Sequence, residues 1–113
     1  MKVAIVGSRS VGPEHYEELC AKVPIGASTI ISGGSKGADM LAKRYAEENN
    51  LFYEEFLPDY ARFGRAAPLK RDQQIVERAD YVIVMWDGKS HGAAYVIKYC
   101  LEVNTAVRTM ICH

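Results

Sequence analysis

Short apolar runs alternate with helical stripes along the whole chain. Residues 3–6 and 81–86 are continuous apolar runs that are too short for helices, so they predict strands buried on both faces. Between such runs the apolar residues recur at helical spacing, as at Tyr16, Leu19 and Val23. The expected elements are strands at residues 3–6, 28–32, 51–57, 81–86 and 105–112, separated by helices at residues 13–23, 38–49, 67–79 and 92–103.

This alternation of strands and helices predicts an α/β fold with a parallel sheet and helices on both of its faces. Right-handed crossovers leave few topologies, and the natural one is a three-layer Rossmann-like arrangement of five strands in the order 3-2-1-4-5. Two adjacent glutamates in residues 51–57 indicate that this strand lies at an edge. Residues 58–66 are expected to be irregular. Ligands of such sheets bind at the carboxyl ends of the strands, near the switch point between strands one and four.

Length and composition narrow the classes of function. The chain has 113 residues, which suits a single domain over 1–113, and its 14 basic residues balance 14 acidic ones. A neutral chain argues against a dedicated DNA binder, so nucleic acid is not the expected partner. No apolar run approaches the ~20 residues of a membrane helix, so we expect no membrane association.

The chain's cysteines and histidines bear on its compartment and on metal binding. Its three cysteines are far apart with apolar neighbours, which predicts buried free thiols and a cytoplasmic location. The histidines show no spacing typical of metal ligands, and we expect neither a metal nor another cofactor.

The segment Gly33–Gly37 follows a strand and opens a helix. This arrangement aims backbone N–H groups and a helix dipole at one point, which suits an anion such as phosphate. The segment matches neither the P-loop nor the G-x-G-x-x-G fingerprint, and a tight turn that uses glycine only for its shape is the alternative. Asp39, in the first helical turn, either caps the helix or accepts from a ribose hydroxyl. The candidate ligand-binding residues here are Gly33, Gly34, Ser35, Lys36, Gly37 and Asp39.

The loops after the first and fourth strands are expected at the same edge of the sheet. Arg9 offers a planar fork of donors suited to phosphate or a purine edge, and an arginine paired with a nearby acid is the alternative. Ser90 and Gly92 precede a helix and form a second candidate anion-binding turn. The candidate ligand-binding residues in these loops are Gly7, Ser8, Arg9, Asp87, Ser90 and Gly92.

Arg71 and Asp72 fall in the first turns of the third helix. Asp72 lies three residues before Ile75, on the apolar stripe of that helix, so its carboxylate needs a partner. Arg9 and Arg71 are the candidates for that partner. A buried ion pair that fixes a loop and a contact with a ligand both remain open for this pair.

Several segments together resemble a known group. Residues 4–9 (AIVGSR) and 31–39 (ISGGSKGAD) resemble the SLOG superfamily, named for the Smf/DprA DNA-processing proteins and the LOG cytokinin-activating enzymes. The segments that resemble its small stand-alone YspA-like branch are residues 57–60 (LPDY), 64–67 (GRAA), 71–72 (RD) and 79–80 (AD). The resemblance implies a Rossmann-like domain that binds nucleotides or nucleotide-derived ligands and forms a homo-oligomer, a dimer or a tetramer.

The resemblance also implies which residues to compare with the LOG enzymes, which cleave the N-glycosidic bond of a nucleoside monophosphate. Gly92 matches the last glycine of their P-G-G-x-G-T-x-x-E motif, but Tyr95 or Val96 stands where its glutamate would be. Arg71 is the counterpart of their catalytic arginine, and Asp72 replaces the usual asparagine. Arg71 and Asp72 are therefore the candidate catalytic residues.

Three functional hypotheses follow. The first is a sensor or processing protein that binds a nucleotide or nucleotide-derived ligand at the carboxyl ends of the strands. The alternative is an enzyme acting on N-glycosidic bonds at the same site, a phosphoribohydrolase or a deoxyribosyltransferase-like protein. A DprA-like single-stranded DNA binder is less well supported, because the chain is neutral.

Overall fold

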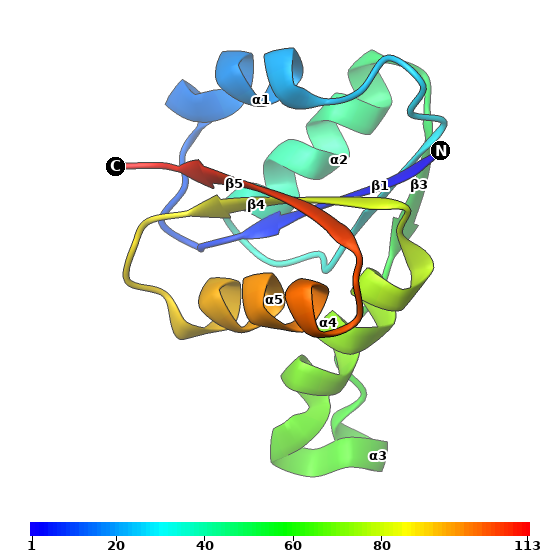
Figure 1. The fold of residues 1–113 in the computed structure, drawn as a ribbon, viewed down its shortest axis with the longest axis vertical. Coiled ribbons are helices and arrows are strands. Elements are labelled where there is room, and N and C mark those ends of the chain that lie inside the picture. Colours follow the sequence, from blue (N-terminus) through cyan, green and yellow to red (C-terminus); the bar gives the residue numbers. More distant parts are fainter.

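Five parallel strands form the centre of the protein. The computed structural model describes all residues 1–113, and its sheet has the order β3-β2-β1-β4-β5, which confirms the predicted fold class and topology (Figure 1). The strands are β1 (Lys2–Gly7), β2 (Thr29–Ser32), β3 (Phe52–Glu55), β4 (Tyr81–Trp86) and β5 (Ala106–Ile111). β3 pairs only with β2, so its predicted position at an edge is also confirmed.

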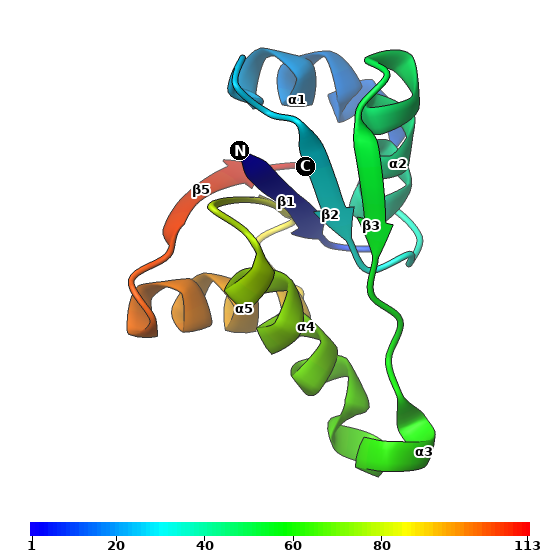
Figure 2. The same cartoon turned by 90° about the vertical axis from the view of Figure 1, so that its right-hand side faces the viewer.

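Helices cover both faces of this sheet (Figures 1 and 2). On one face lie α1 (Tyr16–Lys22), preceded by the short 3₁₀ helix η1 (Pro13–His15), and α2 (Ala38–Glu48). On the other face lie α4 (Ala67–Arg78) and α5 (His91–Glu102). The result is the three-layer arrangement expected from the alternation of strands and helices.

The apolar strands supply side chains to two separate cores. Along β4, Ile83 and Met85 pack in the core under α1 and α2, whereas Val82 and Val84 pack in the core under α4 and α5. This division follows from the two-residue period of a strand, which sends successive side chains to opposite faces. Burial on both faces explains why β1 and β4 are apolar without interruption.

The segment between β3 and α4 differs from the prediction. Residues 58–66 were expected to be irregular, but they contain the one-turn helix α3 (Tyr60–Phe63) and the 3₁₀ helix η2 (Gly64–Ala66). The Asp59 carboxylate caps α3 by accepting from the Arg62 backbone N–H at 3.1 Å. Neither helix has a buried residue, so no apolar stripe marked them in the sequence. Figure 2 shows this segment extending away from the body of the protein.

Two close backbone approaches hold the loops at the carboxyl edge of the sheet. A Cβ atom on Gly7 would overlap the Met85 carbonyl oxygen on β4, and one on Gly37 would overlap the Ser8 carbonyl oxygen. Gly37 also has a φ of +75°, a conformation that side-chain-bearing residues rarely adopt. Glycine at both positions therefore lets the loop after β1 contact β4 and the start of α2.

No helix of the protein has the length and apolar character needed to cross a bilayer.

Replacing Gly37 tests this constraint. We expect Gly37→Ala to lower the free energy of unfolding by about 3 kcal/mol, because the added methyl meets the backbone of Ser8 and the backbone conformation becomes strained. Urea denaturation followed by circular dichroism measures the change. Gly26→Ala is the matched control, since nothing lies within 4 Å of its Cβ position, and we expect a change within about 0.5 kcal/mol. Equal effects of the two substitutions would contradict the interpretation.

Candidate functional site

A cleft of about 460 Å³ lies at the carboxyl ends of β1, β2 and β4, between the loops that follow these strands and the helices α4 and α5. Its position is the switch point of the sheet, where β1 has β2 on one side and β4 on the other. Residues from three strand-ending loops and from α4 therefore meet here. The candidate residues that line the cleft are Gly7, Arg9, Gly33, Ser35, Asp39, Arg71, Asp72, Asp87, Ser90 and Gly92.

Six further residues line the cleft and were not among the candidates. They are Val6, Ser10, Pro68, Ile75, Ala93 and Val96. Ile75 and Val96 lie on the apolar stripes of α4 and α5, and that spacing indicates burial without distinguishing core from cleft wall. Ser10 directly follows the candidate Arg9 in the sequence, and this neighbouring hydroxyl could have marked it as a further candidate. The lining of the cleft thus combines apolar side chains with polar ones.

Four candidate residues do not line the cleft. Gly37 is held against the backbone of the loop after β1. Gly34 and Lys36 border a second hollow of about 390 Å³, which shares Ser35 and Asp39 with the cleft. Ser8 is 1% exposed, and its polar groups bond within the protein.

Ser8 connects all three loops. Its backbone N–H donates to the Met85 carbonyl oxygen at 2.9 Å, and its own carbonyl oxygen accepts from the Ala38 N–H at 3.3 Å. Its hydroxyl oxygen accepts from the Asp87 N–H at 3.1 Å. Ser8 therefore holds together the loops that border the cleft, and this role does not depend on contact with a ligand.

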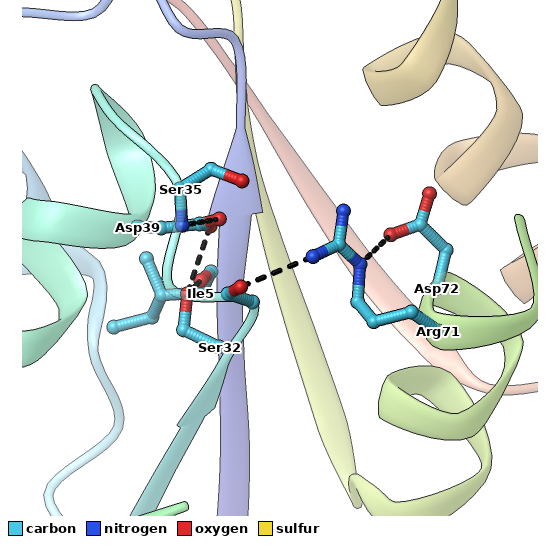
Figure 3. A network of polar contacts seen from close by, with 7 residues as sticks. Ile5, Ser32, Ser35, Asp39, Arg71 and Asp72 are labelled. Carbon is cyan, nitrogen blue, oxygen red and sulfur yellow. Dashed lines mark hydrogen bonds and ion pairs between the residues drawn. The ribbon is translucent and has the colours of Figure 1, made fainter. Parts of the chain in front are cut away.

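The Arg71 guanidinium spans the gap between α4 and the loop after β2 (Figure 3). Nε donates to Asp72 Oδ1 at 3.0 Å, and Nη1 donates to the Gly33 carbonyl oxygen at 3.0 Å. The partner of Asp72 is thus Arg71 and not Arg9. Arg9 is exposed, lines the cleft and takes part in none of the ion pairs of the chain.

The Asp72 carboxyl has a raised pKa. Burial raises its pKa to about 6, against the opposing effect of the Arg71 guanidinium, and its side chain is 14% exposed. A carboxyl with this pKa exchanges its proton near neutral pH, as a general acid or base must. α5 contributes no carboxylate to the cleft. Its Val96 places an apolar side chain there, and the hydroxyl of its Tyr95 accepts from Gln73 Nε2.

Asp39 and Asp87 are both bonded within the protein, in opposite environments. Asp39 is 5% exposed, and burial raises its pKa although its carboxyl group forms hydrogen bonds with Ser32 and Ser35. Asp87 Oδ1 accepts from the backbone N–H groups of Lys89 and Ser90, both at 2.8 Å, and Oδ2 accepts from the Ser10 hydroxyl at 2.8 Å. These donors hold the pKa of the Asp87 carboxyl well below its usual range.

The loop after β4 is shaped by its own polar groups. The Ser90 hydroxyl caps α5 by accepting from the Ala93 N–H at 3.2 Å, and the Trp86 indole N–H donates to the Ser90 carbonyl oxygen at 2.9 Å. No group of three or more His, Cys, Asp or Glu side chains is arranged to hold a metal ion. The cleft lining offers guanidinium and hydroxyl groups together with apolar side chains.

The raised pKa of Asp72 predicts a pH-dependent effect of Asp72→Asn. The folded-state pKa of about 6 lies above the ordinary value of 3.8, so the stabilising contribution of this carboxyl is complete at low pH and is lost as pH rises through about 6. Asparagine does not titrate. Hence the free energy of unfolding of the variant should rise relative to the wild type by up to about 3 kcal/mol between pH 4 and pH 7.

Urea denaturation at several pH values measures this difference. Glu47→Gln, at an exposed position, is the control and should show no comparable trend. A difference between Asp72→Asn and the wild type that stays constant from pH 4 to pH 7 would show that Asp72 is an ordinary carboxylate.

Comparisons with known proteins bear on the amino-terminal half of the cleft. The model of the YspA, cpYpsA-related SLOG family matches residues 1–63, more than half of the chain. The match includes β1, β2, α2 and the loops that carry Arg9 and Gly33. No curated protein and no solved structure gives a significant match. The chain belongs to the YspA, cpYpsA-related SLOG family.

Proposed function

We propose that the protein binds a nucleotide or a nucleotide-derived ligand in the cleft at the carboxyl ends of β1, β2 and β4. The observation that carries this proposal is the composition of the cleft lining, which combines groups suited to a phosphate with apolar side chains suited to a ring within about 460 Å³. Membership of a SLOG family supports the same class of ligand. The ligand fits the general rule that parallel α/β sheets bind small molecules at their switch point.

The polar residues of the cleft lining suit a phosphate. Arg9 has no ion-pair partner, and Arg71 keeps donors free after its bonds to Asp72 and the Gly33 carbonyl oxygen. Ser35 and Ser90 add hydroxyl groups, and Gly92 adds a backbone N–H group in the first turn of α5. An anion between these groups would receive donors from both sides of the cleft.

The apolar residues of the cleft lining suit the flat face of a base. Pro68 and Ile75 come from α4, and Ala93 and Val96 come from α5. A ring packed against Pro68 and the edges of the other three side chains, which are buried, would lose contact with water, and this contributes free energy in proportion to the apolar area covered. Asp87 is the more accessible candidate for a ribose hydroxyl, because Asp39 is only 5% exposed.

The protein's assembly and compartment are parts of the same proposal. We infer that residues 1–113 act as one domain and that the chain forms a homo-oligomer, a dimer or a tetramer. Exposed apolar side chains at Phe52, Leu57, Leu101 and Ile111 support self-association, as does a net charge of zero. Three free cysteines support a reducing compartment such as the cytoplasm.

A thermal-shift panel of nucleoside monophosphates, NAD and ADP-ribose tests the binding proposal. A ligand at 100 times its dissociation constant adds about 2.7 kcal/mol of stability, which is a shift of about 10 °C for a chain of this size. We expect Arg9→Ala to weaken the affinity about 10- to 100-fold, since it removes charged donors from the phosphate. Arg108→Ala, at an exposed position on β5, is the matched control and should bind like the wild type.

The panel also has a result that would overturn the proposal. If no member shifts the melting temperature at about 10 mM, a concentration far above ordinary nucleotide affinities, the cleft is not a nucleotide site. Equal losses of affinity in the Arg9 and Arg108 variants would indicate that the ligand binds elsewhere on the protein.

Cleavage of an N-glycosidic bond is the second candidate function, and the environment of Asp72 favours it. Such cleavage needs a carboxyl group that stabilises an oxocarbenium-like transition state, protonates the leaving base or activates water. Asp72 lines the cleft with a pKa of about 6 and is oriented by Arg71. It supplies the carboxyl that α5 lacks at Tyr95 and Val96.

Release of free base from nucleoside monophosphates, followed by chromatography, tests this second candidate. We expect Asp72→Asn to lower the rate about 10²- to 10⁴-fold, the usual contribution of a general acid or base, while thermal shifts show that it still binds the nucleotide. Arg108→Ala again serves as the control. A nucleotide that binds but releases no base leaves the protein a binding protein, and an unchanged rate in Asp72→Asn removes Asp72 from the chemistry.

A further inference from the structure

The buried hydroxyl of Ser32 has two close oxygen neighbours. Its Oγ lies 2.7 Å from the Ile5 carbonyl oxygen and 2.8 Å from Asp39 Oδ1. Both lengths are typical of O–H···O hydrogen bonds, and each such bond needs a proton between its two oxygens. Ser32 is fully buried and Asp39 is 5% exposed, so solvent does not readily substitute for either contact.

A serine hydroxyl has one proton to donate. The Ile5 carbonyl oxygen can only accept, and an ionised Asp39 could also only accept. With Asp39 ionised, one of the two contacts would join lone pairs to lone pairs at hydrogen-bond distance inside a medium of low polarity. With Asp39 protonated on Oδ1, both contacts become hydrogen bonds.

The remaining contact of Asp39 fixes the position of the second proton. Asp39 Oδ2 accepts from the Ser35 backbone N–H at 3.0 Å, so Oδ2 is the acceptor oxygen and Oδ1 is free to carry a proton. Figure 3 shows Ser35, Asp39, Ser32 and Ile5 gathered on the side of the cleft opposite Asp72. The chain of donors then runs from Ser35 to Asp39, from Asp39 to Ser32 and from Ser32 to Ile5.

We propose that Asp39 is a neutral carboxylic acid in the folded protein, with its proton on Oδ1 donated to Ser32 Oγ. In this role Asp39 is a positioning residue. It links the first turn of α2 to the end of β2 and to the loop that begins at Gly33. All three protons and all three acceptors in this chain of hydrogen bonds are used, and no buried side-chain polar atom of the protein lacks a partner.

The charged surroundings of Asp39 act in both directions. Arg71 lowers the pKa of Asp39, but burial outweighs this effect and raises the pKa overall. Arg71 is bonded to Asp72 and Gly33 instead, and it makes no ion pair with Asp39. The charged and titratable side chains that line the two hollows together with Asp39 are Arg71 and Asp72 from α4, Tyr53 and Glu55 from β3, Asp87 and Arg9 from the strand-ending loops, and Lys36 and Lys43 before and after it in the chain.

A neutral Asp39 has a consequence that rests on the proposed function. The loop Gly33–Gly37 then carries no formal negative charge on its inner side, so an anion in the cleft is not repelled from behind. By linkage, an anionic ligand would hold the proton on Asp39, and ionisation of Asp39 at high pH would weaken the ligand.

Carboxyl-carbon NMR on the full, unliganded chain tests the proposal directly. We expect the Asp39 resonance, assigned by its loss in Asp39→Asn, to have the chemical shift of a protonated acid at about pH 6, where an ordinary aspartate is ionised. Asp87 is the internal reference and should have the shift of an ionised carboxylate in the same spectrum, because its pKa is lowered. An Asp39 resonance that matches that of Asp87 at this pH would overturn the proposal.

Two matched amide substitutions provide a second readout. Asparagine at residue 39 offers an N–H donor to Ser32 and a carbonyl acceptor to Ser35, so it mimics the neutral acid. We expect Asp39→Asn to melt within about 2 °C of the wild type and Asp87→Asn, which replaces an oxygen that only accepts, to melt about 4 °C lower. A loss in Asp39→Asn equal to that in Asp87→Asn would indicate that Asp39 is ionised.

Both measurements are made without ligand. Failure of the nucleotide panel would therefore leave the protonation of Asp39 to be judged on these two measurements. An ionised Asp39 would likewise leave the binding proposal intact.

Discussion

The position of the cleft depends on the hydrogen bonds of Ser8. Its N–H, carbonyl and hydroxyl groups bond to β4, to the start of α2 and to the loop after β4. The partners come from two separate parts of the chain, near residue 38 and at residues 85–87, and Ser8 reaches both because it follows the central strand β1. The bonds form because Gly7 and Gly37 carry no side chain at the two points where backbones meet. The loops thus have little freedom to move independently.

The sheet could be predicted from the sequence because β1 and β4 are buried on both faces. Such strands appear in the sequence as continuous apolar runs that are too short for helices. The burial of Asp72 was likewise visible, since a carboxylate on an apolar stripe must find a partner. Other features left no such mark. α3 is held by a single cap from Asp59, and the places of Ile75 and Val96 in the cleft wall depend on where two helix axes pass the sheet edge. Periodicity reports burial and not the identity of the neighbour.

Three aspartates share one cleft and differ in the groups around them. Asp39 faces a hydroxyl and one N–H group in the interior, Asp72 is mostly buried beside a guanidinium, and Asp87 is surrounded by donors at the surface. Their pKa values diverge accordingly, two raised and one lowered. Divergence of this kind separates groups that can exchange a proton near neutral pH from groups that cannot. In the sequence all three are the same residue type, so their environments could be read only from the fold.

The segment that joins β3 to α4 affects how the protein opens. α3 and η2 bury no side chain, so few apolar contacts oppose the exposure of their backbone to solvent. Amide hydrogens there should exchange through local unfolding, with a free energy well below that of the whole domain. α4 begins directly after this segment and carries Arg71 and Asp72 in its second turn. The helix that carries Arg71 and Asp72 is therefore attached to β3 through a segment that buries no side chain, and opening of that segment would reach the cleft before the sheet itself begins to unfold.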